Sequence, residues 1–219
     1  EVLDQLGGRA RTFKKGKYTH DAGPTVITAP FLFNELFELF NEKLEDHLEF
    51  IHLDPYYRFY FSEEDEIFDY RSCIEDTQKE IKRFNEDDAE GYKNLLNESR
   101  EIYDVGFKKL VHRPFNTIFS MISQIPALLR LKCYRTVWQM VCSHITHPVV
   151  RKAFSIHPLL IGGNPFTTTS IYALIHYLER KWGVFFCMGG TGKLVKELEK
   201  LIQRHEIEIK KNCDVKRIN

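Results

Sequence analysis

The chain has 219 residues, a formal net charge of zero and 43% hydrophobic residues. This length and composition suffice for one large domain or two modest ones with a buried core, and they exclude a chain that is disordered throughout. The charge balance excludes a general attraction to nucleic acid, and without about 18 consecutive apolar residues a transmembrane helix is not expected. The five cysteines are irregularly spaced, which favours reduced thiols and a cytoplasmic location.

Extended and helical segments alternate in the first part of the chain. A turn at residues 15–17 joins two extended segments. An alternating pattern on both sides of the acidic residues 62–66 predicts a β-hairpin. Asn85 and the three acids after it predict a capped helix start, and the helix continues to about Leu110. After Pro30, another helix is predicted because Phe33, Leu36, Phe37, Phe40 and Leu44 recur at helical spacing.

The later part of the chain changes from helices to mixed structure. Two or three helices are expected between breaks at Pro114, Pro126 and Pro148, because proline is tolerated only in a first turn or a loop. Another helix is expected in TSIYALIHYLERKW, followed by a VFF strand and a helix at residues 193–205. IEIK and VKRI predict two final strands. The fold class is therefore α+β, with α/β pieces at both ends.

Charge is unevenly distributed along the chain. Residues 105–178 contain no Asp or Glu but eight Lys or Arg. One interpretation is a buried, substrate-lining region from which an unpaired carboxylate is excluded by its desolvation cost. The other is a face that rests on anionic lipid, which attracts basic side chains. The two interpretations are compatible.

The opening stretch EVLDQLGGRARTF has the spacing of a nucleotide site. In a dinucleotide-binding unit, the second strand ends in an acid that hydrogen-bonds the ribose, and Glu1 would be that acid. Gly7 and Gly8, followed by Arg9, would let bare backbone approach a pyrophosphate where a Cβ atom would collide. An ordinary turn is the alternative explanation of the glycine pair.

The motifs E…GGRARTF…HDAGPTVIT, HPLLIGGNPFTTTSIYALIHYLERKWGVFF and GGTGKLVKELEKLI occur in this order over essentially the whole chain. They resemble the bacterial-type phytoene desaturases, carotenoid dehydrogenases of the amine-oxidase-like flavoprotein superfamily. The resemblance implies part of a Rossmann-like, GG-motif FAD-binding domain plus a largely helical substrate domain. We expect residues 1–30 and 183–219 to belong to the FAD-binding domain, and residues 31–182 to form the substrate and membrane-associated domain with its β-hairpin.

The same resemblance implies missing parts and an activity. A GxGxxG turn would precede Glu1 and further flavin and substrate contacts would follow Asn219, so we expect this chain to be an internal fragment that is inactive alone and retains little FAD. The whole enzyme would transfer hydride from a polyene hydrocarbon such as phytoene to flavin, in carotenoid biosynthesis. It would be cytoplasmic and peripheral to the membrane.

Cofactor and substrate residues are carried over from the resemblance. Glu1 would bind ribose, residues 7–9 would approach the flavin phosphates, Gly23, Pro24 and Thr25 would pass near the isoalloxazine, and the backbone of Val215 would meet the adenine. No catalytic base is assigned, and His157 and His176 are more simply structural. Cys187 stands where the family commonly has proline, which puts the local turn in doubt. The apolar tunnel is expected to include Phe115, Phe119, Trp138, Phe154, Phe166 and Tyr172.

Several alternatives stay open. Cys142, His144 and His147 lack further ligands at zinc spacing, so no metal site is expected. Residues 189–192 do not form a P-loop and fit the tight entry to a helix. A related carotenoid isomerase, saturase or ketolase, or another GG-motif flavin oxidoreductase, fits the same residues. A non-catalytic module that binds a lipid surface is an alternative from another class.

Overall fold

The computed structural model describes residues 1–107, 122 and 124–218, and it divides the chain into two compact units. The first unit contains Glu1–Leu53 and Val184–Asn219, and the second contains Asp54–Gly183. Residues 50–52 belong to the first unit because they pair with its strand at residues 185–187. The division into an FAD-binding and a substrate domain at residues 30 and 182 stays a prediction.

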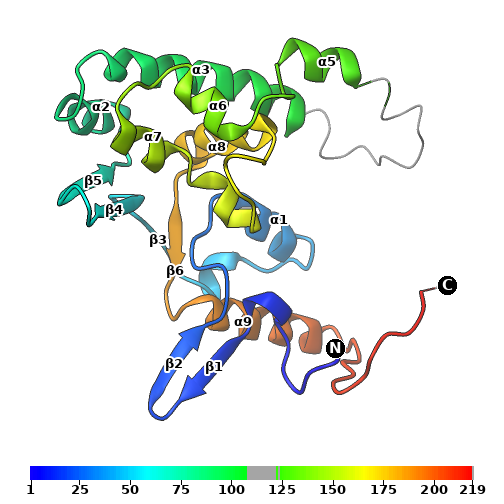
Figure 1. Ribbon diagram of the computed structural model, residues 1–219. Coiled ribbons are helices and arrows are strands. Elements are labelled where there is room, and N and C mark those ends of the chain that lie inside the picture. The colour runs from blue at the N-terminus through cyan, green and yellow to red at the C-terminus, as the bar shows by residue number, and fades with distance from the viewer. Residues whose placement is uncertain (108–121, 123, 219) are drawn as a thin grey trace. The chain divides into compact units, whose positions relative to one another are not determined.

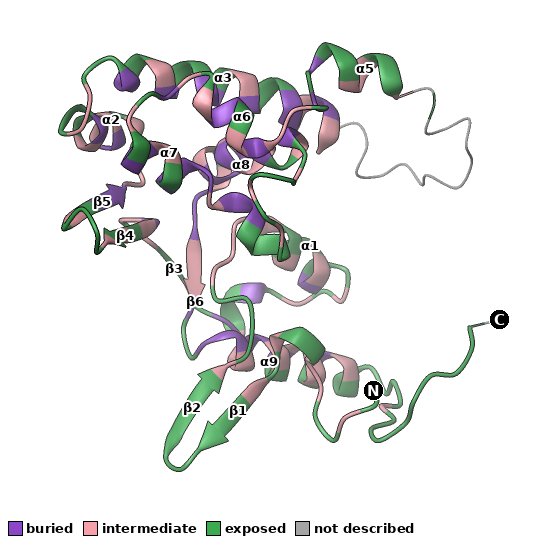
Figure 2. Ribbon diagram, viewed as in Figure 1, coloured by how far each residue is buried: buried purple, intermediate pink, exposed green. Residues whose placement is uncertain are grey.

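The first unit begins with a short 3-10 turn, η1 (Gly8–Ala10), and a β-hairpin (Figure 1). Strands β1 (Thr12–Lys15) and β2 (Tyr18–Asp21) pair in antiparallel register, with Thr12 opposite Asp21. The hairpin is mostly exposed (Figure 2). The predicted turn at residues 15–17 is confirmed.

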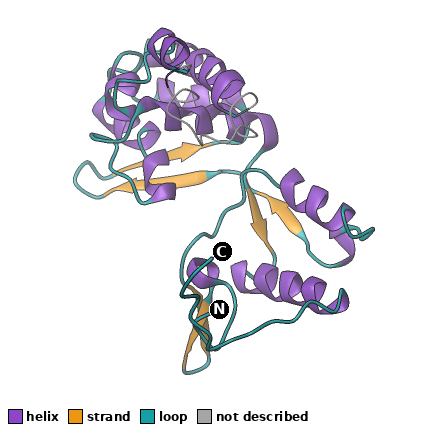
Figure 3. Cartoon of the chain, turned by 90° about the vertical axis from the view of Figure 1, so that its right-hand side faces the viewer, coloured by secondary structure: helices purple, strands orange, loops and turns teal. Residues whose placement is uncertain are grey.

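A second strand pair and two helices complete the first unit (Figure 3). Strands β3 (Phe50–His52) and β6 (Phe185–Cys187) are antiparallel, and Ile27 bridges to Phe185. The helices are α1 (Phe31–Glu38) and α9 (Thr191–Arg204), with the 3-10 turn η2 (Leu44–Asp46) after α1. One cluster of buried core residues in this unit consists of Phe37, Leu44, Leu48, Cys187, Leu194 and Leu201.

The second unit packs helices beside a β-hairpin. Strands β4 (Tyr57–Phe61) and β5 (Glu66–Tyr70) form the hairpin predicted around residues 62–66. Two helices follow, α2 (Ile74–Lys82) and the long α3 (Asp88–Gly106). The remaining elements are α5 (Ile125–Arg130), α6 (Val137–Cys142), α7 (Pro148–Phe154), η3 (His157–Ile161), η4 (Ser170–Ala173) and α8 (Leu174–Trp182).

Local chemistry explains where these helices begin. Pro126 and Pro148 lie in the first turns of α5 and α7, as expected, since a first-turn amide has no helical acceptor. Helix α6 starts with a reciprocal capping box between Thr136 and Gln139. Before α3, Asn85 Oδ1 accepts the Asp87 amide at 3.1 Å, so Asn85 organises the turn while the helix begins at Asp88. Pro114 lies outside the described residues.

The core of the second unit is aromatic. Tyr92 of α3 stacks on Phe154 of α7 with ring centroids 4.9 Å apart, and Tyr70 of β5 meets the edge of Phe154 at 5.4 Å. Phe68 lies at 5.6 Å from Phe154 in a similar edge arrangement. All four side chains are at most 1% exposed. This cluster joins the hairpin to two helices.

Three sequence expectations require correction. The predicted strands at residues 207–210 and 215–218 are not strands, because a strand needs a continuous ladder, whereas the amides of Asn212 and Cys213 bond singly to the carbonyls of Leu3 and Glu1. The helix after Pro30 ends at Glu38, and Leu44 lies in η2 beyond a left-handed Asn41. Helix α2 was not predicted. The α+β class itself is confirmed.

Candidate functional site

Two glycine-containing segments of the first unit lie against each other. The Ala22 amide donates to the Arg11 carbonyl at 2.9 Å, which places residues 23–25 beside residues 7–9. A Cβ atom added to Gly23 would fall 2.1 Å from the Arg9 carbonyl oxygen. Only glycine permits this approach. The sequence predicted that bare backbone at these glycines would come close to another group, and for Gly23 that group is the backbone of Arg9.

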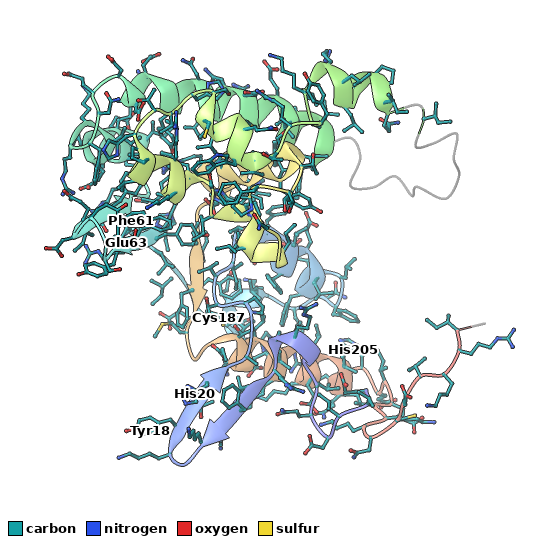
Figure 4. All side chains as sticks on the ribbon, in the orientation of Figure 1. Tyr18, His20, Phe61, Glu63, Cys187 and His205 are labelled. Carbon is teal, nitrogen blue, oxygen red and sulfur yellow. The ribbon has the colours of Figure 1, made fainter. Side chains whose placement is uncertain are left out.

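A third segment, residues 189–192, meets the same loop. It follows Cys187, the last residue of β6 (Figure 4), and leads into α9. The Thr191 hydroxyl donates to the Pro24 carbonyl. The carboxylate of Asp21 accepts the Thr191 amide at 3.1 Å and the Gly192 amide at 3.3 Å. Residues 189–192 form the tight helix entry that the sequence predicted, and burial raises the pKa of the Cys187 thiol.

The sequence analysis missed Asp21 and Thr191. Asp21 ends a strand and Thr191 begins a helix, and 170 positions separate them. The sequence did contain a sign that this helix start needs a distant partner. Helix α9 begins after a Gly pair and has no Ser, Thr, Asp or Asn at its N-cap. Such a helix needs an acceptor from elsewhere in the chain.

Glu1 and the end of the chain also approach each other within the first unit. The Glu1 backbone nitrogen donates to the Lys210 carbonyl at 3.0 Å, and the Cys213 amide donates to the Glu1 carbonyl at 2.9 Å. The Glu1 carboxylate accepts the Leu3 amide at 3.1 Å. Val215, two residues beyond Cys213, is 69% exposed. The structure thus brings Glu1 near the segment that carries Val215.

The second unit buries an ionisable cluster around Glu179 of α8. One carboxylate oxygen accepts the Tyr57 hydroxyl at 2.7 Å, and the other lies 3.0 Å from His157 Nε2. Glu179 and His157 are 0% and 1% exposed. Burial, followed by the Glu179 charge, holds the pKa of Tyr57 well above its ordinary value. These bonds support the structural role expected for His157.

His176 completes this cluster, and among the described residues its ring nitrogens make no hydrogen bond to another side chain. Its ring is fully buried and meets the His157 ring edge-on, with centroids 4.0 Å apart. Burial, and then the neighbouring His157 and Arg180, hold the pKa of His176 well below 6.5. The ring is therefore neutral over the physiological range.

Arg180 is a half-buried cation of the second unit. Its guanidinium lies 4.3 Å from the centroid of the Tyr70 ring and donates to the Tyr92 hydroxyl at 2.6 Å. It also donates to the carbonyls of Arg71 and Ser72 at 2.6 and 2.8 Å. Burial raises the pKa of Tyr92 to about 12. Arg180 thus ties α8 to the hairpin and α3 through neutral partners.

The predicted substrate residues separate into two groups. Trp138 and Phe166 contact each other, with ring centroids 4.9 Å apart, and Phe166 is 58% exposed. Phe154 lies in the buried aromatic core, and Tyr172 lies partly exposed in η4. The structure therefore pairs two of these residues and separates Phe154 from the surface. Phe115 and Phe119 lie outside the described residues.

His144 and His147 each bond to an acidic residue of α3, His144 through its ring and His147 through its backbone amide. His144 Nε2 lies 2.6 Å from a Glu98 oxygen, and the His147 amide donates to Asp88. Within residues 1–107, 122 and 124–218, no three His, Cys, Asp or Glu residues gather as metal ligands. Glu98 and His144 border an open, largely polar depression of about 420 Å³ on the second unit. None of the predicted site residues lines it.

A family described as flavin containing amine oxidoreductase matches residues 1–219, the whole chain. The chain belongs to the flavin containing amine oxidoreductases. Its curated relatives include three lycopene-forming phytoene desaturases. The one from Pantoea ananas is 43% identical over 203 residues, which cover 93% of this chain and 41% of the relative. Those from Pseudescherichia vulneris and a Paracoccus strain are 40% and 39% identical over the whole chain and 44% of each relative.

The chain therefore spans less than half the length of these relatives. A flavin cofactor, which the family implies, would bring an anionic phosphate group. Gly8 has a left-handed φ of 49° and open space where a Cβ would stand, and Arg9 is an exposed cation beside it. Bare backbone next to a cation fits an anionic phosphate group. The resemblance to phytoene desaturases is confirmed.

Proposed function

We propose that this chain is part of an FAD-dependent carotene desaturase of the phytoene desaturase type. The observation that carries the proposal is its 39–43% identity, over nearly all of its length, to three proteins that bear this name. More distant relatives, at 26–28% identity, include further phytoene and diapophytoene desaturases. The substrate would be a polyene hydrocarbon, and the reaction would introduce a double bond.

The first unit would contribute to a Rossmann-like FAD-binding domain. Residues 7–9 would hold the phosphates, residues 23–25 would lie along the flavin ring, and Glu1 and the backbone at Val215 would hold the adenosine. The close contact between residues 7–9 and Gly23 supports a single binding site for the phosphates and the flavin ring. The bonds of residues 210–213 to Glu1 support the proposal that Glu1 and Val215 bind the same adenosine group. When bound, FAD would supply the two-electron oxidant of the reaction.

The second unit would contribute to substrate binding. A hydrocarbon offers no polar group, so its affinity must come from buried apolar area, at about 25 cal/mol per Å². Trp138 and Phe166, which contact each other and retain exposed surface, are the best-supported wall residues, together with Tyr172 of η4. Phe154 would support this wall from the core, since its ring is already surrounded by aromatic neighbours. Phe115 and Phe119 stay predictions.

Contact with a membrane surface would give access to such a substrate. No helix in the part of the chain that the structure describes is long and apolar enough to cross a bilayer. Leu159, Leu160 and Ile161 of η3 are 46–62% exposed, and the acid-free segment around them supplies basic residues. We predict that Leu159→Ser/Ile161→Ser weakens flotation of the full-length protein with anionic vesicles, while Leu39→Ser, an exposed leucine of the first unit, does not. If the wild-type protein floats equally well with neutral and with anionic vesicles, basic side chains do not contribute to membrane binding as proposed.

A second candidate function comes from one relative. A 4,4'-diapolycopen-4-al dehydrogenase from Metabacillus indicus is 28% identical over the whole chain. This name favours oxidation of a polyene aldehyde as the alternative within the same lineage. The isomerase, saturase and ketolase alternatives have no such support.

Expression of the full-length gene in cells that accumulate phytoene tests the proposal. We expect phytoene to decrease and more conjugated polyenes to appear in the pigment extract. Gly23→Val, which places a branched side chain against the Arg9 carbonyl, should abolish the change. Unchanged phytoene in cells that contain flavin-loaded protein would contradict the desaturase assignment.

A further inference from the structure

Helix α9 has the features of an anion-binding helix start. Fourteen residues long, it begins after Gly189 and Gly190, and the free amides of a first helical turn attract negative charge. A phosphate could in principle use this start. The structure fills it with a side chain of the same chain, because the Asp21 carboxylate accepts the amides of Thr191 and Gly192.

The fit around Asp21 leaves no room for a larger group. A Cβ atom added to Gly190 would fall 2.6 Å from Asp21 Oδ2, and the backbone there has a left-handed φ of 76°. Thr191 is 8% exposed. The helix start is therefore neutralised by an internal carboxylate and is not available to a ligand phosphate.

The same helix start also holds the loop that follows Asp21. The Thr191 hydroxyl donates to the Pro24 carbonyl, three residues after the carboxylate that accepts the Thr191 amide. Gly23, between these two points, rests against the Arg9 carbonyl. One threonine thus bonds both ends of a four-residue loop, from Asp21 to Pro24.

We propose that Asp21 and Thr191 are positioning residues that hold residues 23–25 in place for the flavin ring. This inference rests on the proposed function, in which residues 23–25 lie along that ring. The charged end of β2 and the start of α9 fix the loop from one side, and the backbone of Arg9 fixes it from the other. The loop is then ordered before the cofactor binds, which lowers the entropy cost of binding.

The test measures FAD affinity and the thermal stability of the apo form for the full-length protein and its variants. Thr191→Val and Asp21→Ala remove the two bonding groups, and Thr191→Ser keeps the hydroxyl. Thr19→Val and Asp46→Asn are matched controls on exposed residues of the same unit. We expect the first two variants to bind FAD at least about tenfold more weakly. Thr191→Ser should bind within about twofold of the wild type, and the controls should be unchanged.

Two results would overturn the inference in distinguishable ways. If Thr191→Val lowers the apo melting temperature but binds FAD with wild-type affinity, the contact is merely structural and the proposed function survives. If the wild-type protein binds no FAD, the proposed function fails together with the inference. Should Asp21→Ala not fold, the comparison of Thr191→Val with Thr191→Ser decides the question.

Discussion

At the residue scale, the hydroxyl of Tyr57 is the clearest single contribution to the buried Glu179 cluster. Its bond to a fully buried carboxylate is 2.7 Å long. We predict that Tyr57→Phe lowers the free energy of unfolding by about 1–3 kcal/mol, because the carboxylate loses a donor that water cannot replace. Urea denaturation of the full-length protein measures the change.

Tyr60→Phe is the matched control for this prediction. Tyr60 lies on the same strand, is 65% exposed and donates to the exposed Asp65 at 3.2 Å. Its loss should change the free energy of unfolding by less than about 0.5 kcal/mol. Equal effects of the two substitutions would contradict the importance assigned to the cluster.

The burial of His176 makes the free energy of unfolding depend on pH, and we predict the direction of this dependence. Its pKa in the folded chain is held well below 6.5 by burial, His157 and Arg180, so the unfolded chain binds the proton first as the pH falls. Stability that is present above about pH 6.5 is therefore lost as the pH falls below that value. Each proton bound only by the unfolded chain contributes about 1.4 kcal/mol per pH unit.

His176→Phe should remove this contribution. We expect the slope of unfolding free energy against pH, measured between about pH 5.5 and 6.5, to decrease by up to one proton. Leu39→Ser changes an exposed side chain that has no titratable group and should leave the slope unaltered. A His176→Phe protein with the wild-type slope would refute the assignment.

At the element scale, the packing of α3 depends on a glycine in its first turn. A Cβ atom at Gly91 would fall 1.9 Å from the His144 carbonyl oxygen. Gly→Ala in a helix usually stabilises by up to about 1 kcal/mol, but here we predict a loss of at least about 2 kcal/mol, because backbone must move. Gly106→Ala at the other end of α3 meets only ordinary contacts, the nearest at 3.4 Å, and should be neutral or stabilising. Thermal unfolding of both variants compares them, and the opposite order would contradict the packing described.

The elements with strong local signals could be predicted from the sequence. The turn at Gly16, the acidic hairpin turn and the prolines at the starts of α5 and α7 are set by residues within a few positions. Helix α2 could not, because only Thr77 and Ile81 of its nine residues are buried and its other residues are mostly polar. The IEIK and VKRI segments have strand-like alternation, but alternation cannot supply the neighbouring strand that a ladder requires.

At the scale of the whole molecule, the glycine motifs of the candidate site could be predicted but their partners could not. A glycine pair indicates that the backbone there lies close to a ligand or to another part of the chain. Which group comes close depends on contacts between distant segments, such as Gly23 with Arg9 or Asp21 with Thr191. The same holds for Glu179, whose partners Tyr57 and His157 lie on β4 and η3.

The two compact units also show what a linear sequence conceals. The first unit is built from both ends of the chain, and one of its two described strand pairs joins residues 50–52 to residues 185–187. No low-complexity linker marks residue 53, so this boundary could not be placed from the sequence. The assignment of the two units to FAD and substrate stays a proposal.

The most direct test mixes the FAD-loaded, full-length protein with phytoene in lipid vesicles without oxygen, and records the flavin and polyene absorbance together. The account predicts that the absorbance of oxidised flavin disappears while a longer conjugated polyene forms in matching amount. Flavin that stays oxidised beside unchanged phytoene would contradict the account.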